Sequence, residues 1–249
     1  MCLIVVGWHA HTDFPLLVAA NRDEFQARPT APAARWPGAP QVIGGRDLEA
    51  GGTWLGITNS GRFAAVTNVR EPGMAPGKYS RGQLPRDFLL SAIPAADYAE
   101  QLVGADYSGF NLLLADGHSL LYCSNRENQP RLLPPGIYGV SNHRLDSPWP
   151  KLQSARQKFT AALPGLPDDS AFFELLADKS IVADGELPQT GVPLEWERLL
   201  SAVFVQSASY GTRASTLVWQ RADGAVRLHE RSFGPDGLAT QSSVISTAV

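Results

Sequence analysis

The sequence has 249 residues, of which 44% are hydrophobic and 18% are charged, so the chain is long enough to bury the core of one large domain. Its formal net charge of -3 provides no basic surface of the kind that nucleic acids require. No apolar run approaches the roughly 20 residues that span a bilayer, and the N-terminus does not look like a secretion signal. These features predict a soluble, cytoplasmic protein without nucleic-acid partners and without a membrane span, and they leave its oligomeric state open.

Metal and cofactor motifs are missing from the sequence. The chain has two cysteines, Cys2 and Cys123, too few for a disulfide framework or a thiolate zinc site, which indicates a reducing compartment. Its five histidines show no metal-ligand spacing, and the glycine pairs at 44–45 and 51–52 follow no nucleotide-binding pattern. We therefore predict no metal and no cofactor, and we interpret the paired glycines as turn residues.

Strand-like segments recur along the chain as hairpins. The first hairpin joins residues 2–8 to residues 15–20 through a loop at 9–14. Three more turn at Asn, Ser, Asp and Gly residues that tolerate positive φ. Their predicted strands cover residues 53–58, 62–67, 110–115, 119–123, 215–220 and 225–230.

Amphipathic helices are predicted between the hairpins. The clearest begins near Pro150, a residue suited to the first helical position, and another follows the cap candidates Asp169 and Ser170. Shorter helices are predicted at 83–91 and 95–102, and loops at 28–40 and 178–192. The pattern predicts an α+β fold of two antiparallel sheets packed face to face and covered by helices, in a single domain over residues 1–249.

Cys2 is the first candidate for chemistry. A small second residue favours removal of Met1 by aminopeptidase, which gives an N-terminal cysteine. Its thiol (pKa about 8.5) and α-amino group (pKa about 7.7 to 8.0) then supply a nucleophile and a general base from one residue. The alternative is a small apolar residue that starts a buried strand.

A polar cluster, Asn21-Arg22-Asp23-Glu24, directly follows the apolar strand at 16–20. If the first two strands pair as a hairpin, the cluster lies near Cys2. Arg22 would then lower the pKa of the thiol and Asp23 would orient the amine. The alternative is a salt-bridged loop.

Asparagines and one arginine complete the candidates. Asn68, Asn111 and Asn142 stand at strand ends, where a side-chain amide can donate to an oxyanion, or can simply serve a turn. Arg213 opens a late strand and is suited to clamp a carboxylate or phosphate, or to form an ordinary ion pair.

Eight blocks of sequence together resemble one known family. The resemblance to the NRDE family, also called the transport and Golgi organisation protein 2 family, covers nearly the whole chain. The blocks are Met1-Cys2-Leu-Ile-Val-Val, Asn21-Arg22-Asp23-Glu24, Gly51-Gly-Thr-Trp-Leu-Gly56, Thr67-Asn68-Val69-Arg70, Ser80-Arg81-Gly82, Phe110-Asn111-Leu112, Ser141-Asn142 with Trp149-Pro150-Lys151, and Tyr210-Gly211-Thr212-Arg213. This family is similar to the N-terminal nucleophile hydrolases, which implies a four-layer αββα architecture.

The resemblance also implies roles for particular residues. In the choloylglycine hydrolase branch of these hydrolases, the nucleophilic cysteine follows the initiator methionine, as Cys2 does here. That branch has an arginine and an aspartate at the end of the second strand, for which Arg22 and Asp23 are our matches. Two residues separate the pair in that branch and none does here, so Glu24 is the alternative for the acidic role.

Further residues of that branch surround the oxyanion and the nucleophile. It uses two strand-end asparagines, for which Asn68 and Asn142 are the candidates, and a later arginine, for which Arg213 is the candidate. The resemblance implies a hydrolase that cleaves a linear amide or related acyl bond through a Cys2 thioester. The alternative is a non-enzymatic binding or trafficking protein for a lipid, acyl-CoA or haem ligand on the same fold, and a structural interaction protein has less support, because the sequence has no coiled coil or repeat.

Overall fold

A computed structural model describes residues 2–247. Within this range the strands form two antiparallel sheets. The first has six strands in the order β10-β1-β2-β11-β12-β13. Their bounds are β1 (Cys2–Trp8), β2 (Leu16–Phe25), β10 (Gly136–Val140), β11 (Tyr210–Gln220), β12 (Val226–Phe233) and β13 (Ala239–Ser246).

The second sheet has seven strands in the order β3-β4-β5-β6-β7-β8-β9. This order follows the sequence, because each strand pairs with its predecessor. The bounds are β3 (Thr30–Trp36), β4 (Ala39–Asp47), β5 (Leu55–Thr58), β6 (Phe63–Asn68), β7 (Phe110–Ala115), β8 (Leu120–Ser124) and β9 (Arg131–Leu132).

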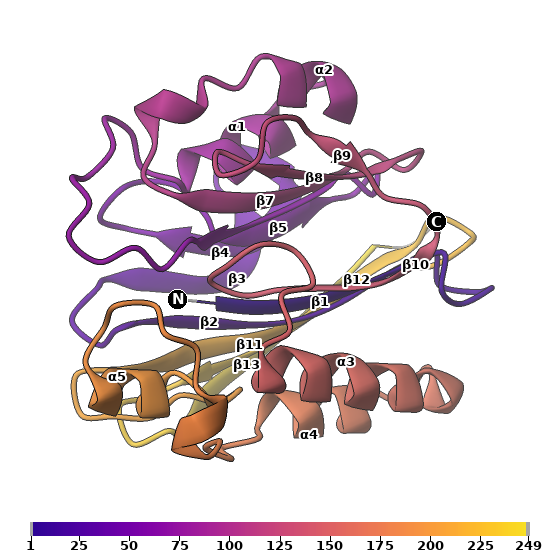
Figure 1. Cartoon of the computed structure of the whole chain (residues 1–249). Coiled ribbons are helices and arrows are strands. Elements are labelled where there is room, and N and C mark those ends of the chain that lie inside the picture. The colour runs from indigo at the N-terminus through magenta and orange to yellow at the C-terminus, as the bar shows by residue number, and fades with distance from the viewer. Residues whose placement is uncertain (1, 248–249) are drawn as a thin grey trace.

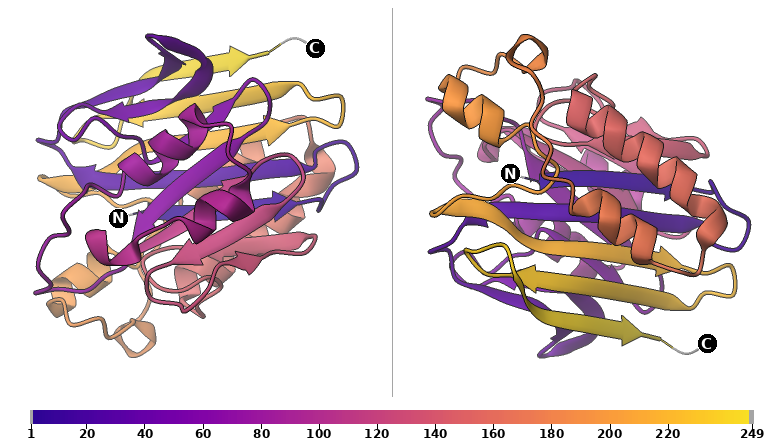
Figure 2. Two further views of the ribbon diagram at one scale, coloured as in Figure 1. Left: turned by 90° about the horizontal axis from the view of Figure 1, so that it is seen from above. Right: turned by 90° about the horizontal axis from the view of Figure 1, so that it is seen from below.

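Helices cover the outer faces of both sheets (Figure 1; Figure 2). The α1 (Gln83–Leu90) and α2 (Ala95–Glu100) helices lie on the seven-stranded sheet, and α3 (Pro150–Ala162) and α4 (Ser170–Leu176) lie on the six-stranded one. The short α5 (Leu194–Leu199) lies at the end of the sandwich where β1 begins (Figure 1). Single-turn 3-10 helices occupy 104–106, 163–165 and 184–186.

The largest part of the core lies between the two sheets. Buried side chains of β1 and β2, such as Ile4 and Val18, pack there against Ile43, Phe63 and Leu113 of the second sheet. Alternate residues of the same strands point outward, and a second cluster of them packs under α3 and α4. The predicted four-layer αββα arrangement is therefore confirmed.

The predicted surface loop at 28–40 is wrong, because β3 and the start of β4 occupy it. The prolines of this segment favour a loop over a strand. Pro32 lies on the edge strand of the sheet, at an irregularity in register between Ala31 and Ala34. A residue without an N–H is tolerated at such a position, since no ladder hydrogen bond is lost.

The interpretation of Gly44 and Gly45 as turn residues is also wrong, since both lie inside β4. A Cβ at Gly44 would lie 2.6 Å from the carbonyl oxygen of Leu55, and a Cβ at Gly45 would lie 2.1 Å from the indole of Trp54. Neighbouring atoms thus lie too close to the backbone for a side chain at these two positions, and only glycine fits there.

No helix within residues 2–247 has both the length and the apolar character needed to cross a membrane.

Candidate active site

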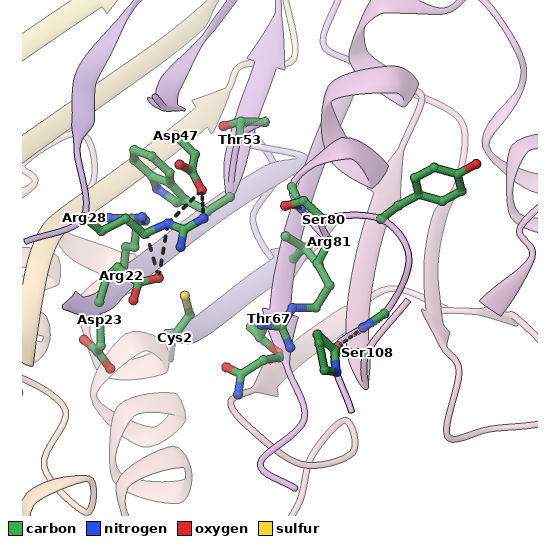
Figure 3. Close-up of a pocket in the computed structure, with 18 of the residues that line it drawn as sticks. Cys2, Arg22, Asp23, Arg28, Asp47, Thr53, Thr67, Ser80, Arg81 and Ser108 are labelled. Carbon is green, nitrogen blue, oxygen red and sulfur yellow. Dashed lines mark hydrogen bonds and ion pairs between the residues drawn. The ribbon is translucent and has the colours of Figure 1, made fainter. Parts of the chain in front are cut away.

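A cavity of about 330 Å³ opens between the sheets at the start of β1, and we call it the Cys2 cavity. Figure 3 shows the thiol of Cys2 at its centre, with β2 on one side and the segment that contains Ser80 and Arg81 on the other. The lining comes from both sheets and from the loop before α1. It consists of Cys2, Arg22–Glu24, Arg28, Asp47, Thr53, Trp54, Val66–Asn68, Pro76–Gly82 and Ser108.

The polar cluster of residues 21–24 lies within β2, which runs to Phe25, so the expectation that it follows the end of the strand is wrong. The strand continues because β1 and β11 pair with it on both sides, with Cys2 opposite Arg22. The predicted proximity to Cys2 is confirmed by this register. Neighbouring residues of a strand point to opposite faces, and Figure 3 shows Arg22 and Asp23 diverging from β2 in this way.

Arg22 lies on the same face as Cys2 and is 5% exposed. Its guanidinium stacks on Trp54, 4.4 Å from the ring centroid, and its Nη2 is 3.8 Å from Oε2 of Glu24. A cation in this position favours the thiolate, and it lowers the pKa of Cys2.

Burial nevertheless raises the pKa of the Cys2 thiol above its ordinary value, and the charge of Asp23 adds to this effect. Arg22 and the backbone N–H of Asp23 act in the opposite direction without cancelling it. The backbone of Cys2 is fixed by Ser141, whose hydroxyl donates to the Cys2 carbonyl at 2.9 Å. A half-buried thiol of this kind needs a base to become a nucleophile.

Asp23 lies on the helix side of β2 and is 1% exposed. Its Oδ1 accepts a hydrogen bond from Thr212 at 2.8 Å. Burial raises the pKa of its carboxyl group, while Lys151 of α3, Thr212 and Arg22 oppose that rise. Lys151 is itself buried and donates to the Leu200 carbonyl at 2.8 Å, and burial lowers its pKa to about 8.

Glu24, the alternative acidic residue, lies toward the rim of the cavity. Its Oε2 is 3.8 Å from Arg22 and 4.0 Å from Arg28, and Arg28 also pairs with Asp47 at 2.7 Å. Both carboxylates therefore line the cavity, but their surroundings differ. Asp23 acts on the thiol and on Lys151, whereas Glu24 belongs to a cluster of surface ion pairs.

The two candidate asparagines contact each other. Asn68, at the end of β6, lines the cavity, while Asn142 is fully buried behind it. The amide nitrogen of Asn142 donates to Oδ1 of Asn68 at 2.9 Å. The amide nitrogen of Asn68 points away from Asn142 and donates to the Val69 carbonyl at 3.2 Å. Asn111, by contrast, is buried and its amide bonds Thr67, His143 and Tyr122.

Arg213 does not line the Cys2 cavity. It occupies an irregularity in register of β11, between Thr212 and Ala214. There its Nη1 donates to the carbonyl groups of Phe25 and Gln26 at 3.0 Å. The structure therefore brings together Cys2, Arg22, Asp23 and Asn68, places Asn142 directly behind them, and separates Arg213 from the thiol.

Sequence reasoning did not assign Trp54, Arg81 or Lys151 to the site. All three lie within blocks that carry the family resemblance, which was the available signal. Arg81 lines the cavity and donates to the Gly109 carbonyl at 3.1 Å. Burial lowers the pKa of Arg81, although the Cys2 thiol opposes that effect.

Within residues 2–247 no three His, Cys, Asp or Glu side chains are grouped to hold a metal ion.

Comparison with known proteins identifies the family of the chain and its fold. The family model described as Transport and Golgi organisation 2 matches residues 1–235. The Transport and Golgi organization protein 2 homologs of Bos taurus and Homo sapiens are 38% and 37% identical over 241 residues, covering 88% of this chain and 87% of each relative. A solved Caenorhabditis elegans N-acylethanolamine-hydrolyzing acid amidase ortholog aligns with a TM-score of 0.52 and 15% identity, over 87% of this chain and 92% of its own. The structural likeness confirms the N-terminal nucleophile hydrolase fold, and the chain belongs to the Transport and Golgi organisation 2 family.

Proposed function

We propose that this protein is an N-terminal nucleophile hydrolase that cleaves a linear amide or related acyl bond through a thioester on Cys2. The observation that carries the proposal is the convergence of Cys2, Arg22, Asp23 and Asn68, from three strands of two sheets, on one cavity. Its volume of about 330 Å³ falls within the range of small-molecule sites.

Removal of Met1, which lies outside the described residues, would give Cys2 a free α-amino group. The antiparallel register with Cys2 opposite Arg22 directs that amine toward Asp23. The amine takes the proton from the thiol and the sulfur attacks the substrate carbonyl carbon. The protonated amine is held by the Asp23 carboxylate, a role that its location on the strand next to Cys2 supports.

The negative charge that develops on the substrate oxygen needs a donor. The amide of Asn68 is the donor that we assign, since Asn142 fixes its orientation. Collapse of the intermediate breaks the C–N bond, and the ammonium group returns its proton to the leaving nitrogen. Water then attacks the thioester with the amine as base, which releases the acid and restores the thiol.

The competing function is a binding or trafficking protein that uses the same cavity, and the names of the curated relatives favour it. In that case the Cys2 side chain contacts a ligand without forming a covalent bond. The two functions differ in whether the α-amino group of Cys2 has to be free.

The test compares two preparations of one sequence, expressed with and without an inhibitor of methionine aminopeptidase and checked by intact mass. Each is treated with an activated ester that transfers its acyl group to thiols, and acylated peptides are identified by mass spectrometry. We expect fast acylation of Cys2 and its turnover by hydrolysis only in the preparation that lacks Met1. Cys2→Ala should abolish the reaction, and Cys123→Ala, which changes a thiol buried in the other sheet, should leave it unchanged.

Equal acylation and turnover of Cys2 with and without Met1 would contradict the hydrolase proposal and favour the binding protein. The Asn142→Ala variant adds a second readout. Because Asn142 acts through Asn68, its loss should lower kcat with little change in KM. A rise in KM alone would show that Asn142 shapes the cavity without orienting the oxyanion donor.

A further inference from the structure

A second cavity, of about 170 Å³, lies on the other side of Arg22 and Trp54 from the thiol. Arg213 also lines it, and we call it the Arg22–Arg213 cavity. Its remaining lining comes mainly from β3, β12 and β13, and the exposed Thr240 and Gln241 lie at its mouth. Because Arg22 and Trp54 line both cavities, they form the wall between them.

Both arginines have buried N–H groups without a hydrogen-bond partner in the part of the chain that the structure describes. For Arg22 the group is Nη1, since Nη2 faces Glu24 and the guanidinium plane lies on Trp54. For Arg213 the group is Nε, while Nη1 donates to three backbone carbonyls. Buried donors are costly to leave unpaired, so each indicates a missing acceptor.

The charges around this cavity also favour an anion. The carboxylate in its lining is Glu230, which is 2% exposed and already accepts hydrogen bonds from Ala33 N at 2.6 Å and Thr216 Oγ1 at 3.0 Å. Burial lowers the pKa of Arg213, and the like charge of Arg22 lowers it further. The acidic groups that act on the two guanidinium groups are Glu24, which is 3.8 Å from Nη2 of Arg22 and also acts on Arg213, and Glu230, whose two oxygens already accept hydrogen bonds. Neither provides a hydrogen-bond acceptor for Nη1 of Arg22 or Nε of Arg213.

The size of the cavity limits the ligand. A volume of about 170 Å³ is about half that of the Cys2 cavity, and it is enough for one small oxyanion with its water. Arginine is suited to oxyanions, because its N–H groups donate in a planar fork.

We propose that the Arg22–Arg213 cavity binds a small tetrahedral oxyanion such as inorganic phosphate, and that the bound anion slows reactions of the Cys2 thiol by neutralising Arg22. The link between the two cavities is the side chain of Arg22, which stabilises the thiolate on one face and would bind the anion on the other. This inference requires a reactive thiol but does not require that the protein is a hydrolase.

The first experiment measures binding. Thermal unfolding of the full chain is followed in phosphate, in sulfate and in chloride at equal ionic strength. Phosphate at about ten times its Kd should raise the Tm by about 3 °C, and the shift should grow with the logarithm of its concentration, whereas chloride should not raise the Tm. An equal effect of chloride would overturn the proposal, because it would show general screening of charge.

The second experiment measures the effect on Cys2 as the rate of its alkylation by iodoacetamide at one pH near 8, counted by mass spectrometry on the Cys2 peptide. We expect phosphate to slow the reaction about threefold, which corresponds to a change of about half a pKa unit in the thiol. An unchanged rate at saturating phosphate would overturn the coupling through Arg22.

The matched variants locate the site. Arg213→Gln should abolish the phosphate effect, but it also removes backbone hydrogen bonds and can unfold the chain. The second variant is therefore Gln241→Glu, a near-isosteric change at the mouth that repels or replaces the anion. The Gln153→Glu change adds the same charge at an exposed position of α3 as a control. Equal phosphate responses of Gln241→Glu and Gln153→Glu would overturn the proposed location.

Discussion

Lys151 is a buried ammonium group in contact with backbone on the helix side of the site. Its exposed fraction is 6%, and its Nζ donates to the carbonyl of Leu200. Burial lowers its pKa from the ordinary 10.5 to about 8, although the neighbouring Asp23 opposes the shift. The folded chain therefore holds this proton less tightly than the unfolded chain does.

The pH dependence of stability should show this difference. Between about pH 8 and pH 10.5 the unfolded state binds more protons at Lys151, so the free energy of unfolding gains from this residue as the pH rises. Below about pH 8 the folded chain carries the full cost of burying the charged ammonium group of Lys151. The free energy of unfolding of the wild type minus that of Lys151→Met should rise by up to about 1.4 kcal/mol per pH unit in this window. Urea unfolding at several pH values measures this difference.

The control for Lys151 is the exposed Lys179. Lys179→Met removes the same charge from an exposed position, and the change with pH expected for Lys151→Met should exceed any change that this control shows. A change for Lys151→Met no larger than that of the control would mean that the buried ammonium keeps an ordinary pKa in the folded chain.

The β4 strand shows how a whole element is shaped by one side chain of the site. Trp54 lies between Gly45 and the guanidinium of Arg22, and a Cβ at Gly45 would come within 2.1 Å of its ring. Thr53 adds hydrogen bonds to the Gly45 and Leu55 carbonyls, at 2.7 and 2.9 Å. The strand thus provides a flat backbone surface that holds Trp54 as the wall between the two cavities.

Gly45→Ala should therefore displace Trp54 and destabilise the protein by about 1 to 3 kcal/mol, as overpacking of a buried contact does. The measurement is the free energy of unfolding in urea. Gly165→Ala is the matched control, since a Cβ at Gly165 meets no atom within 4 Å, and it should be nearly neutral. Equal stability of the two variants would show that Trp54 adapts without cost.

Elements with a clear apolar periodicity and well-marked turns could be predicted from the sequence. Elements that depend on pairing with distant strands could not. The hairpin of β1 and β2 and the helix at Pro150 were predicted correctly, because apolar periodicity and turn residues mark them. The end of β2 was not predicted, because its polar residues continue the strand by pairing with β1 on one side and β11 on the other. Edge strand β3 was missed because it contains Pro32 and is flanked by two more prolines. The separation of Arg213 from the thiol depends on an irregularity in register that no local pattern reveals.

At the scale of the whole molecule, one buried carboxyl group joins the two sheets. Glu230 lies on β12 of the six-stranded sheet, and its Oε1 accepts a hydrogen bond from the backbone of Ala33 on β3 of the other sheet. Its Oε2 accepts one from Thr216 on β11. Burial raises the pKa of Glu230 above its ordinary value, even though both hydrogen bonds and Arg22 favour the charged form.

Because its pKa is raised in the folded state, Glu230 contributes less to stability at high pH than at low pH. Above the ordinary value of 4.5 the folded state keeps a proton that the unfolded state has lost, so the contribution of Glu230 to stability falls as the pH rises through its folded pKa. The Glu230→Gln variant keeps an acceptor for Ala33 without titrating. The free energy of unfolding of the wild type minus that of Glu230→Gln should therefore decrease as the pH rises above 4.5. The control is Glu174→Gln, at an exposed position of α4, which should not reproduce this decrease. If the difference between the wild type and Glu230→Gln instead rises with pH, the hydrogen bonds outweigh burial and keep Glu230 charged.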